Sequence, residues 1–262
     1  MLPSRFEQLL NESAGKPFVF DHHDMRTMHF DGRFIQSAMR ISAPDALLLS
    51  YTKAMMAFML FNPEPQHILM IGLGGGSLAK YCYRHLPNSR ITVLELDADV
   101  IALRDAFAIA DNDDRFQIMH ADAVDYINQL DDRADIILHD GFTVDGLSPV
   151  LSTAHFYQRC YEALNPGGVL VSNLWEEGSD LTPVMTGLRS AFGTSMWECT
   201  AINSYNRIVF SVKHADESID QSTLTNNALV LDRQYGLAFA ELVEQFDINA
   251  SSLTPTTHHT NT

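Results

Sequence analysis

Five short apolar runs, each separated from the next by a segment of helical character, constrain the fold of this chain most strongly. The runs lie at residues 68–71, 91–96, 116–119, 136–138 and 169–172. Strands that are apolar throughout are buried on both faces, and a parallel neighbour is reached only through a long crossover connection, usually a helix. The pattern therefore predicts an α/β domain whose parallel sheet is covered by helices on both sides.

Strand and helix signals also flank this core. Residues 196–202 and 207–212 predict an antiparallel hairpin, and residues 229–246 predict one helix after it. Upstream, residues 17–42 are rich in strand formers, with Asp31-Gly32 as a hairpin turn, and residues 45–61 have helical spacing of apolar side chains. The sheet is thus expected to combine five parallel strands with an antiparallel pair.

Charge and cysteine content limit the classes of partner. The chain has 262 residues and a formal net charge of −16, with 33 acidic against 17 basic residues. Such a surface repels phosphate backbones and anionic lipid, so we expect neither nucleic acid nor a membrane as partner. It would attract cations such as polyamines, although acidity that serves only solubility is the simpler interpretation. Three scattered cysteines and no apolar leader predict a reducing, cytoplasmic location.

A glycine-rich turn, GLGGG at residues 72–76, follows the first apolar run and precedes a helix that extends to about Leu86. Glycines permit a tight turn and a close approach of a ligand, and the following helix presents its N-terminal N–H groups. The same turn also serves as a plain connection between strand and helix, so it is weak support for a site by itself. An acid about twenty residues later, Glu95, strengthens the interpretation as a nucleotide site.

Three acids follow the next apolar runs. Glu95 ends the second run and is placed to accept hydrogen bonds from both ribose hydroxyls, whereas Asp97 fits the cap of the following helix better. Asp122 fits two roles: a helix cap, and an adenine ligand beside the small Ala123. Asp140 ends the fourth run, where a carboxylate is costly to bury without a partner. Because open α/β sheets bind ligands beyond the carboxyl ends of their strands, we expect Asp140 to act in a site.

Residues 28–175 resemble the spermidine synthases, the polyamine aminopropyltransferase family. The resemblance rests on pieces in matching order and spacing: Phe30-Asp31-Gly32 to Gln36, Tyr51, Gly72 to Ser77, Glu95, Asp122-Ala123, Asp140 and His155-Phe156-Tyr157. It implies an α/β, Rossmann-like fold of the S-adenosylmethionine-dependent methyltransferase type, with a mostly parallel seven-stranded sheet and a small N-terminal β-hairpin region. We divide the chain into that hairpin region with its linking helix (1–62), the nucleoside-binding domain (63–250) and a disordered tail (251–262).

The resemblance also implies a reaction. In the family, an amine of putrescine attacks the methylene beside the sulfonium of decarboxylated S-adenosylmethionine, and methylthioadenosine leaves. The residues assigned to the nucleoside are Gln36, Gly72, Gly74, Gly75, Glu95, Asp122, Ala123 and Asp140, and Tyr51 is assigned to the substrate. The amine must lose a proton to a nearby carboxylate, for which Asp140 is the first candidate and Asp145 the second. No metal is expected.

The amine half of the implied site departs from the family. Gly75 stands where the family has an aspartate for the terminal amine of the aminopropyl group, and Thr143 stands where it has the general base. Asp145 would substitute only if the loop were rebuilt, and Lys53 would be a poor neighbour for a dication unless it faces solvent. Loss of a carboxylate at Gly75 removes a repulsion, which leads to the hypothesis that intact S-adenosylmethionine fits.

Three functions follow from this pattern. The first is a spermidine-synthase-like transferase that uses S-adenosylmethionine or its decarboxylated form as co-substrate, with a small amine as acceptor. The second is a small-molecule methyltransferase on the same scaffold. The third is a non-catalytic protein that binds methylthioadenosine or polyamines, a reading that the threonine at position 143 favours. A homodimer is expected, since Met55, Met56 and Met59 suit either the core or an interface.

Overall fold

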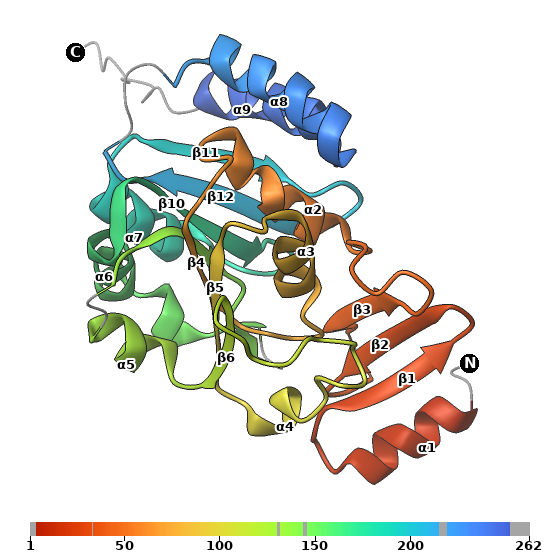
Figure 1. The fold of residues 1–262 in the computed structure, drawn as a ribbon. Helices are drawn as coiled ribbons and strands as arrows, with labels where there is room; N and C mark the ends of the chain where they lie inside the picture. Colours follow the sequence, from red (N-terminus) through yellow and green to blue (C-terminus); the bar gives the residue numbers. More distant parts are fainter. Residues whose placement is uncertain (1–3, 33, 130–131, 144–145, 215–218, 252–262) are drawn as a thin grey trace, which may run out of the picture.

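A seven-stranded, mostly parallel sheet forms the centre of the computed structural model, which describes residues 4–32, 34–129, 132–143, 146–214 and 219–251 (Figure 1). The strands are β4 (His67–Ile71), β5 (Arg90–Glu95), β6 (Phe116–His120), β7 (Ala134–His139), β10 (Leu164–Trp175), β11 (Met196–Thr200) and β12 (Asn206–Val212). Their order is β11-β12-β10-β7-β4-β5-β6, and among these strands β12 runs antiparallel to both of its neighbours, β10 and β11, whereas the other pairs are parallel. The fold class predicted from the sequence is confirmed.

The strand order explains where a site can form. The chain leaves β4 toward β5 on one side and later returns to place β7 on the other side. At such a reversal the two crossover helices lie on opposite faces, which leaves a crevice beyond the carboxyl ends of the strands. Because β12 is antiparallel, with Asn206 paired to Trp175, its first residue lies at the same edge as the end of β10.

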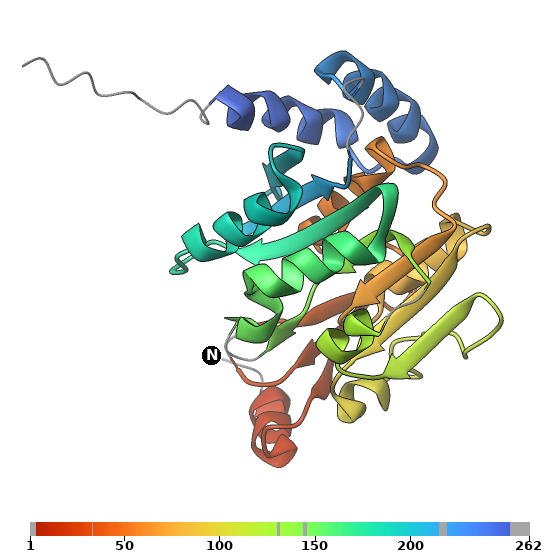
Figure 2. The ribbon, with the colours of Figure 1, turned by 90° about the vertical axis from the view of Figure 1, so that its left-hand side faces the viewer.

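Helices cover both faces, as the apolar runs predict. The helical elements around the sheet are α2 (Ser50–Met55), the 3₁₀ helix η1 (Met56–Leu60), α3 (Ser77–His85), α4 (Ala98–Ile101), α5 (Ala123–Asn128), the 3₁₀ helix η2 (Pro149–Ser152), α6 (Ala154–Ala163), α7 (Thr182–Phe192), α8 (Gln221–Tyr235) and α9 (Phe239–Ser251). In β4, Leu69 and Ile71 pack into the layer of α5, α6 and α7 that Figure 2 shows, whereas Ile68 and Met70 pack into the layer of α2, η1, α3, α8 and α9. Strict alternation of β4 between two cores is what period 2 requires.

Two helix predictions are wrong in detail. The helix expected over residues 45–61 begins only at Ser50 and tightens into η1. The single helix expected over residues 229–246 is two helices, because Gly236 adopts φ 65° after α8, and Asp232 accepts the N–H groups of Phe239 and Ala240 at the start of α9. Glycine is suited to that left-handed position.

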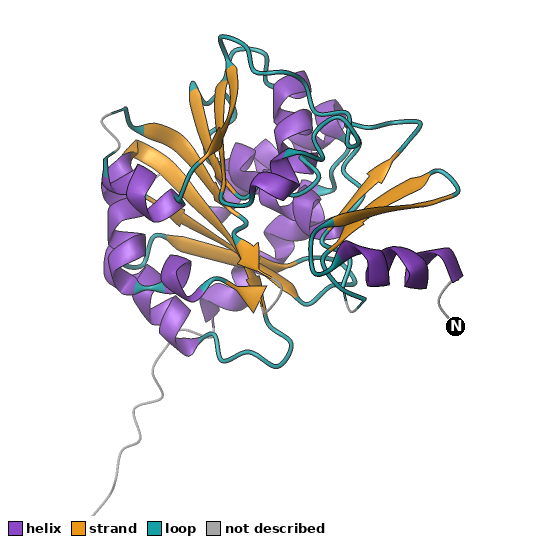
Figure 3. Cartoon of the chain, turned by 90° about the horizontal axis from the view of Figure 1, so that it is seen from below, coloured by secondary structure: helices purple, strands orange, loops and turns teal. Residues whose placement is uncertain are grey.

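The N-terminal region forms a second, three-stranded antiparallel sheet beside the main one (Figure 3). It comprises α1 (Ser4–Ser13), which the sequence did not predict, and strands β1 (Phe18–His22), β2 (Met25–His29) and β3 (Ser37–Arg40). The tight turn lies at residues 23–24, where His23 has φ 52°, rather than at Asp31-Gly32, which belongs to the wider β2–β3 connection. That connection reaches toward the carboxyl edge of the main sheet and supplies residues of the site.

Three further findings concern the linking helix, the C-terminal residues and the length of the helices. Met55, Met56 and Met59 are fully buried, so they belong to the core of this chain. Of the expected tail, residues 252–262 lie outside the described residues, and Ser251 ends α9. None of the helices within the described ranges is long and apolar enough to cross a membrane.

Candidate functional site

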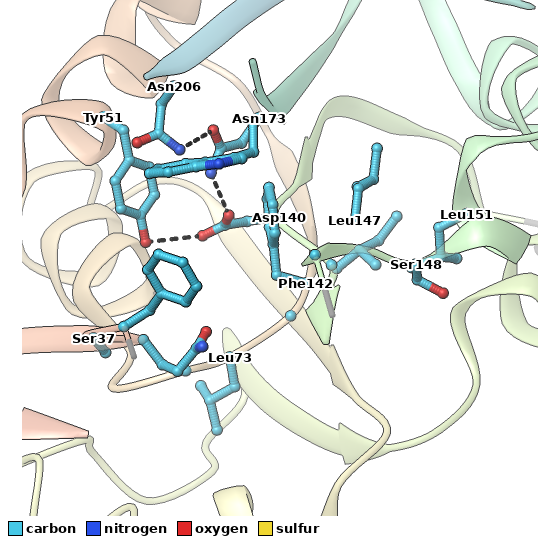
Figure 4. A pocket seen from close by; sticks show the side chains of 18 of the residues that line it. Ser37, Tyr51, Leu73, Asp140, Phe142, Leu147, Ser148, Leu151, Asn173 and Asn206 are labelled. Atoms are coloured by element: carbon cyan, nitrogen blue, oxygen red, sulfur yellow. Dashed lines mark hydrogen bonds between the residues drawn. The ribbon is translucent and has the colours of Figure 1, made fainter. Parts of the chain in front are cut away.

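A cavity of about 1320 Å³ opens at the carboxyl edge of the sheet (Figure 4). Its walls come from the β2–β3 connection, helix α2, the turns after β4 to β7, the loop before α6 and the end of β10. Most of the residues that the sequence assigns to the nucleoside line it: Gln36, Gly72, Gly74, Glu95, Asp122, Ala123 and Asp140, together with Tyr51. Parallel strands place these residues at one edge although they are far apart in the chain.

The glycine-rich turn brings two strand ends together. Gly72 has φ 95°, and a Cβ built there would lie 2.4 Å from the carbonyl oxygen of Asp140. No other residue type fits that position, since it combines a left-handed backbone with direct backbone contact. The close approach places the turn after β4 beside the turn after β7.

Glu95 ties the second strand to this turn. Its Oε2 accepts the Leu73 N–H at 2.9 Å, and its Oε1 accepts the Asp97 N–H at 2.9 Å. Each oxygen keeps a second lone pair for a ligand, so the geometry is compatible with ribose hydroxyls. Asp97 caps α4 through the Asp99 N–H at 2.8 Å, as the sequence predicts.

Asp122 has both features that the sequence left open. Its Oδ1 accepts the N–H groups of Val124 and Asp125 at the start of α5, so it is the helix cap. It also lines the cavity next to the buried Ala123. A cap needs only one of the two carboxylate oxygens, which leaves the second for a ligand.

Asp140 is held by two side chains from other elements (Figure 4). The Tyr51 hydroxyl of α2 donates to Oδ2 at 3.3 Å, and Asn173 Nδ2 of β10 donates to Oδ1 at 2.7 Å. Burial raises the pKa of Asp140, whereas the hydrogen bonds from Asn173 and Tyr51 lower it. A half-buried carboxylate with a raised pKa at a cavity wall is equipped to accept a proton.

Gly75 is not among the cavity-lining residues. A Cβ added there would lie 2.6 Å from Ser37 Oγ and 2.7 Å from a ring carbon of Phe107. Lys80, whose pKa burial lowers to about 8, donates to the Phe107 carbonyl at 2.7 Å and holds that turn against α3. The space that a side chain at position 75 would need is therefore filled by the Phe107 ring and the Ser37 hydroxyl.

Two further residues that the sequence singled out are Asp145 and Lys53. Asp145 lies outside the described residues, between the short strands β8 (Phe142–Thr143) and β9 (Gly146–Leu147). Lys53 is exposed and does not line the cavity. Among the residues that the structure describes, no group of three or more His, Cys, Asp or Glu side chains could hold a metal ion.

Sequence reasoning missed several residues of the site. Asn173 and Asn206 line the cavity, and Ser37 and Phe107 fill the place beside Gly75. Asn173 carried a usable signal, since it follows the apolar run 169–172 directly, as Asp140 follows its own run. Phe107 carried none, because it reaches Gly75 only through the folded turn after α4.

The order of the sheet, the glycine-rich turn after its first parallel strand and the acids that follow it define an α/β protein with a Rossmann-like fold of the methyltransferase type. The comparisons with known proteins then identify the family. The profile described as "Spermine/spermidine synthase domain" matches residues 48–223. The polyamine aminopropyltransferase of Chromobacterium violaceum is 34% identical over 230 residues, which cover 87% of each chain. The chain belongs to the spermine/spermidine synthase family, whose members are transferases.

Solved structures agree on the fold. A probable spermidine synthase from Corynebacterium glutamicum has a TM-score of 0.66 at 22% identity, covering 81% of this chain and 83% of that one. Human methyltransferase-like protein 13, in complex with SAH, has a TM-score of 0.63 at 26% identity, covering 71% and 92%. The same scaffold thus occurs in proteins with both kinds of name.

Proposed function

We propose that this transferase moves the aminopropyl group of decarboxylated S-adenosylmethionine to a small amine. The observation that carries the proposal is Asp140, a half-buried carboxylate on the cavity wall with a donor on each oxygen and a pKa raised by burial. Family membership supports the reaction class, and the acidic chain suits a cationic acceptor.

The reaction needs a proton acceptor and an aligned pair of reactants. An alkyl ammonium has a pKa of about 10, so the attacking nitrogen must first give a proton to a carboxylate. The free amine then forms a bond to the methylene carbon, while the carbon–sulfur bond breaks and its electron pair neutralises the sulfonium. Methylthioadenosine leaves without further assistance, so the protein contributes mainly position.

The nucleoside would lie along the turns after the parallel strands. Gly72 and Gly74 give close backbone approach, Glu95 would accept the ribose hydroxyls, and Asp122 beside Ala123 would hold adenine. Gln36 and Tyr51 would close the site from the N-terminal side. These assignments rest on the common cavity and on the free acceptor positions described above.

A second candidate is supported by the packing at Gly75. Phe107 and Ser37 fill the space beside Gly75, so position 75 offers no carboxylate to recognise a terminal ammonium. Intact S-adenosylmethionine would meet no repulsion there, as a methyltransferase requires. Calorimetric titration with decarboxylated S-adenosylmethionine, S-adenosylmethionine, methylthioadenosine and S-adenosylhomocysteine separates the two. At least tenfold preference for the decarboxylated form supports aminopropyl transfer, and the opposite preference supports methyl transfer.

The catalytic test uses Asp140→Asn, with diamines as acceptors and mass-spectrometric detection of product. We expect turnover to fall about 100-fold or more, as loss of a general base does. Affinity for methylthioadenosine should stay within a few-fold, because the ribose and adenine contacts proposed for Glu95 and Asp122 do not involve the Asp140 carboxylate. Asp145→Asn is the matched comparison. If that variant loses turnover and Asp140→Asn keeps it, the base is Asp145.

Two finer expectations accompany this function. We propose that the protein acts as a homodimer in the cytoplasm, with a small-molecule amine and the nucleoside co-substrate as its partners. Family membership is the support for both statements. Light scattering of the purified protein tests the assembly, and a monomer at micromolar concentration would contradict it.

A further inference from the structure

A chain of side-chain hydrogen bonds leads from the β11–β12 turn to Asp140. Ser204 Oγ donates to Asn206 Oδ1, Asn206 Nδ2 donates to Asn173 Oδ1 at 2.9 Å, and Asn173 Nδ2 donates to Asp140 Oδ1 at 2.7 Å (Figure 4 shows the last two). We call Ser204, Asn206 and Asn173 the amide relay. Asn173 and Asn206 are only 2% and 7% exposed, so little of either side chain is open to solvent.

The side chains of the relay all donate in the direction of Asp140. The N–H of Asn206 donates to Ser204 Oγ at 3.2 Å, and a backbone N–H can only donate. Ser204 Oγ in turn donates its proton to Asn206 Oδ1, and with Oδ1 on that side Nδ2 of Asn206 faces Asn173. Asn173 accepts with Oδ1 and presents Nδ2 to Asp140.

The direction of these hydrogen bonds determines which protonation state of Asp140 is favoured. At Oδ1 it faces an amide N–H, and at Oδ2 it faces the Tyr51 hydroxyl. Two donors stabilise the carboxylate and not the neutral acid, in opposition to the effect of burial. Were the amide of Asn173 reversed, its oxygen would face Asp140, and the carboxyl group would have to keep a proton to bond with it.

We propose that the amide relay is a positioning device that keeps Asp140 ionised and oriented as the proton acceptor of the reaction. The inference rests on the proposed function for its catalytic meaning. Ser204, Asn206 and Asn173 act through Asp140 and are positioning residues in this proposal. The β11–β12 hairpin thereby contributes to catalysis although it stands outside the parallel part of the sheet.

The principal test is Asn173→Leu, which removes the donor at similar volume. The acid limb of the kcat/KM profile reports the pKa of the base in the free enzyme, and loss of a donor raises that pKa. We expect the limb to move up by about one pH unit, with activity lost near neutrality and partly recovered at alkaline pH. Asn206→Asp is the second variant: its carboxylate attracts the Asn173 amide N–H and reverses the amide, so the limb should move in the same direction.

A matched control lies at the other end of the same two strands. Asn165 of β10 donates to Asp135 of β7 at 2.8 Å. This pair repeats the Asn–Asp hydrogen bond at a place away from the cavity. Asn165→Leu should change thermal stability at most and leave the pH profile in place. An unchanged limb in both Asn173→Leu and Asn206→Asp, with folded protein, overturns the proposal.

A direct titration separates the relay from the proposed function. Carboxyl ¹³C resonances of aspartate-labelled protein, with Asp140 assigned through Asp140→Asn, report its ionisation without turnover. Absence of aminopropyl transfer in the unmodified protein refutes the function alone. An Asp140 resonance that titrates at the same pH in Asn173→Leu refutes the relay, whatever reaction the protein catalyses.

Discussion

At Gly75, the space for a side chain is taken by neighbours from two other segments. Ser37 ends the β2–β3 connection, and Phe107 is fully buried in the turn after α4. The residue type at position 75 is thus coupled to the residue at position 107. The family resemblance implies an acid at position 75, and the contacts show that any side chain there meets Ser37 and Phe107.

We predict that Gly75→Asp destabilises the protein by about 1–3 kcal/mol, the usual cost of overpacking. Because the clash is with the Phe107 ring, Gly75→Asp combined with Phe107→Ala should be less destabilised than the sum of the single variants. Urea unfolding of the four proteins measures this coupling. Strict additivity would show that the two positions do not compete for space.

Helix α5 begins at a residue with two roles. Asp122 is the cap of the helix and also faces the cavity, so helix geometry and ligand position depend on one carboxylate. Glu95 also has two roles, since it accepts the Leu73 N–H of the glycine-rich turn and lines the cavity. Asp122 and Glu95 thus each stabilise the backbone at the end of an element and line the cavity.

Substitutions at Asp122 separate the roles. Asp122→Ala should lose about 1 kcal/mol of stability with the cap, whereas Asp122→Ser keeps an oxygen in capping position and should stay close to the parent. If the carboxylate also binds adenine, both variants lose affinity for methylthioadenosine. Thermal unfolding and calorimetry on the same samples give the two readouts. Full affinity of Asp122→Ser for methylthioadenosine would show that Asp122 acts only as the helix cap.

On the scale of the whole molecule, two cores share one sheet, and the layer under α6 buries an uncharged histidine. His139 of β7 is fully buried, contacts the rings of Phe156 and Tyr157, and has no hydrogen-bond partner among the described residues. Burial lowers the pKa of His139 to about 4. In the unfolded chain the imidazole has a pKa of about 6.5, so it takes up a proton at a higher pH than in the folded protein. Protonation therefore favours unfolding in acid.

We predict that this histidine makes stability fall with acid. Above pH ~6.5 both states are neutral at this site, and below it the unfolded state binds the proton first. The loss reaches about 3 kcal/mol near pH 4, since each unit of pKa difference corresponds to 1.36 kcal/mol. Urea unfolding of the parent and of His139→Leu from pH 7 to pH 4 tests it. A stability difference that does not change with pH would contradict the assignment.

The apolar runs, the glycine-rich turn and the acids after the strands were sufficient to predict the strands of the sheet and the cavity residues at the strand ends, whereas Gln36 and Tyr51 were assigned through the family resemblance. These features are local: a strand buried on both faces must be apolar, and the turn after β4 requires glycine where Gly72 meets Asp140. Parallel topology then gathers residues from strand ends such as Glu95 and Asp140 at one edge, whatever their spacing in the chain.

Contacts between distant segments decided the rest, because they depend on how elements pack and not on periodicity. Phe107 reaches Gly75 from a turn, and the antiparallel insertion of β12 brings Asn206 to Asn173 and so to Asp140. The break between α8 and α9 follows the same rule, since Asp232 caps a helix that begins seven residues later. Hydrogen bonds and van der Waals contacts act only over a few ångströms, so their partners exist only once the chain has folded.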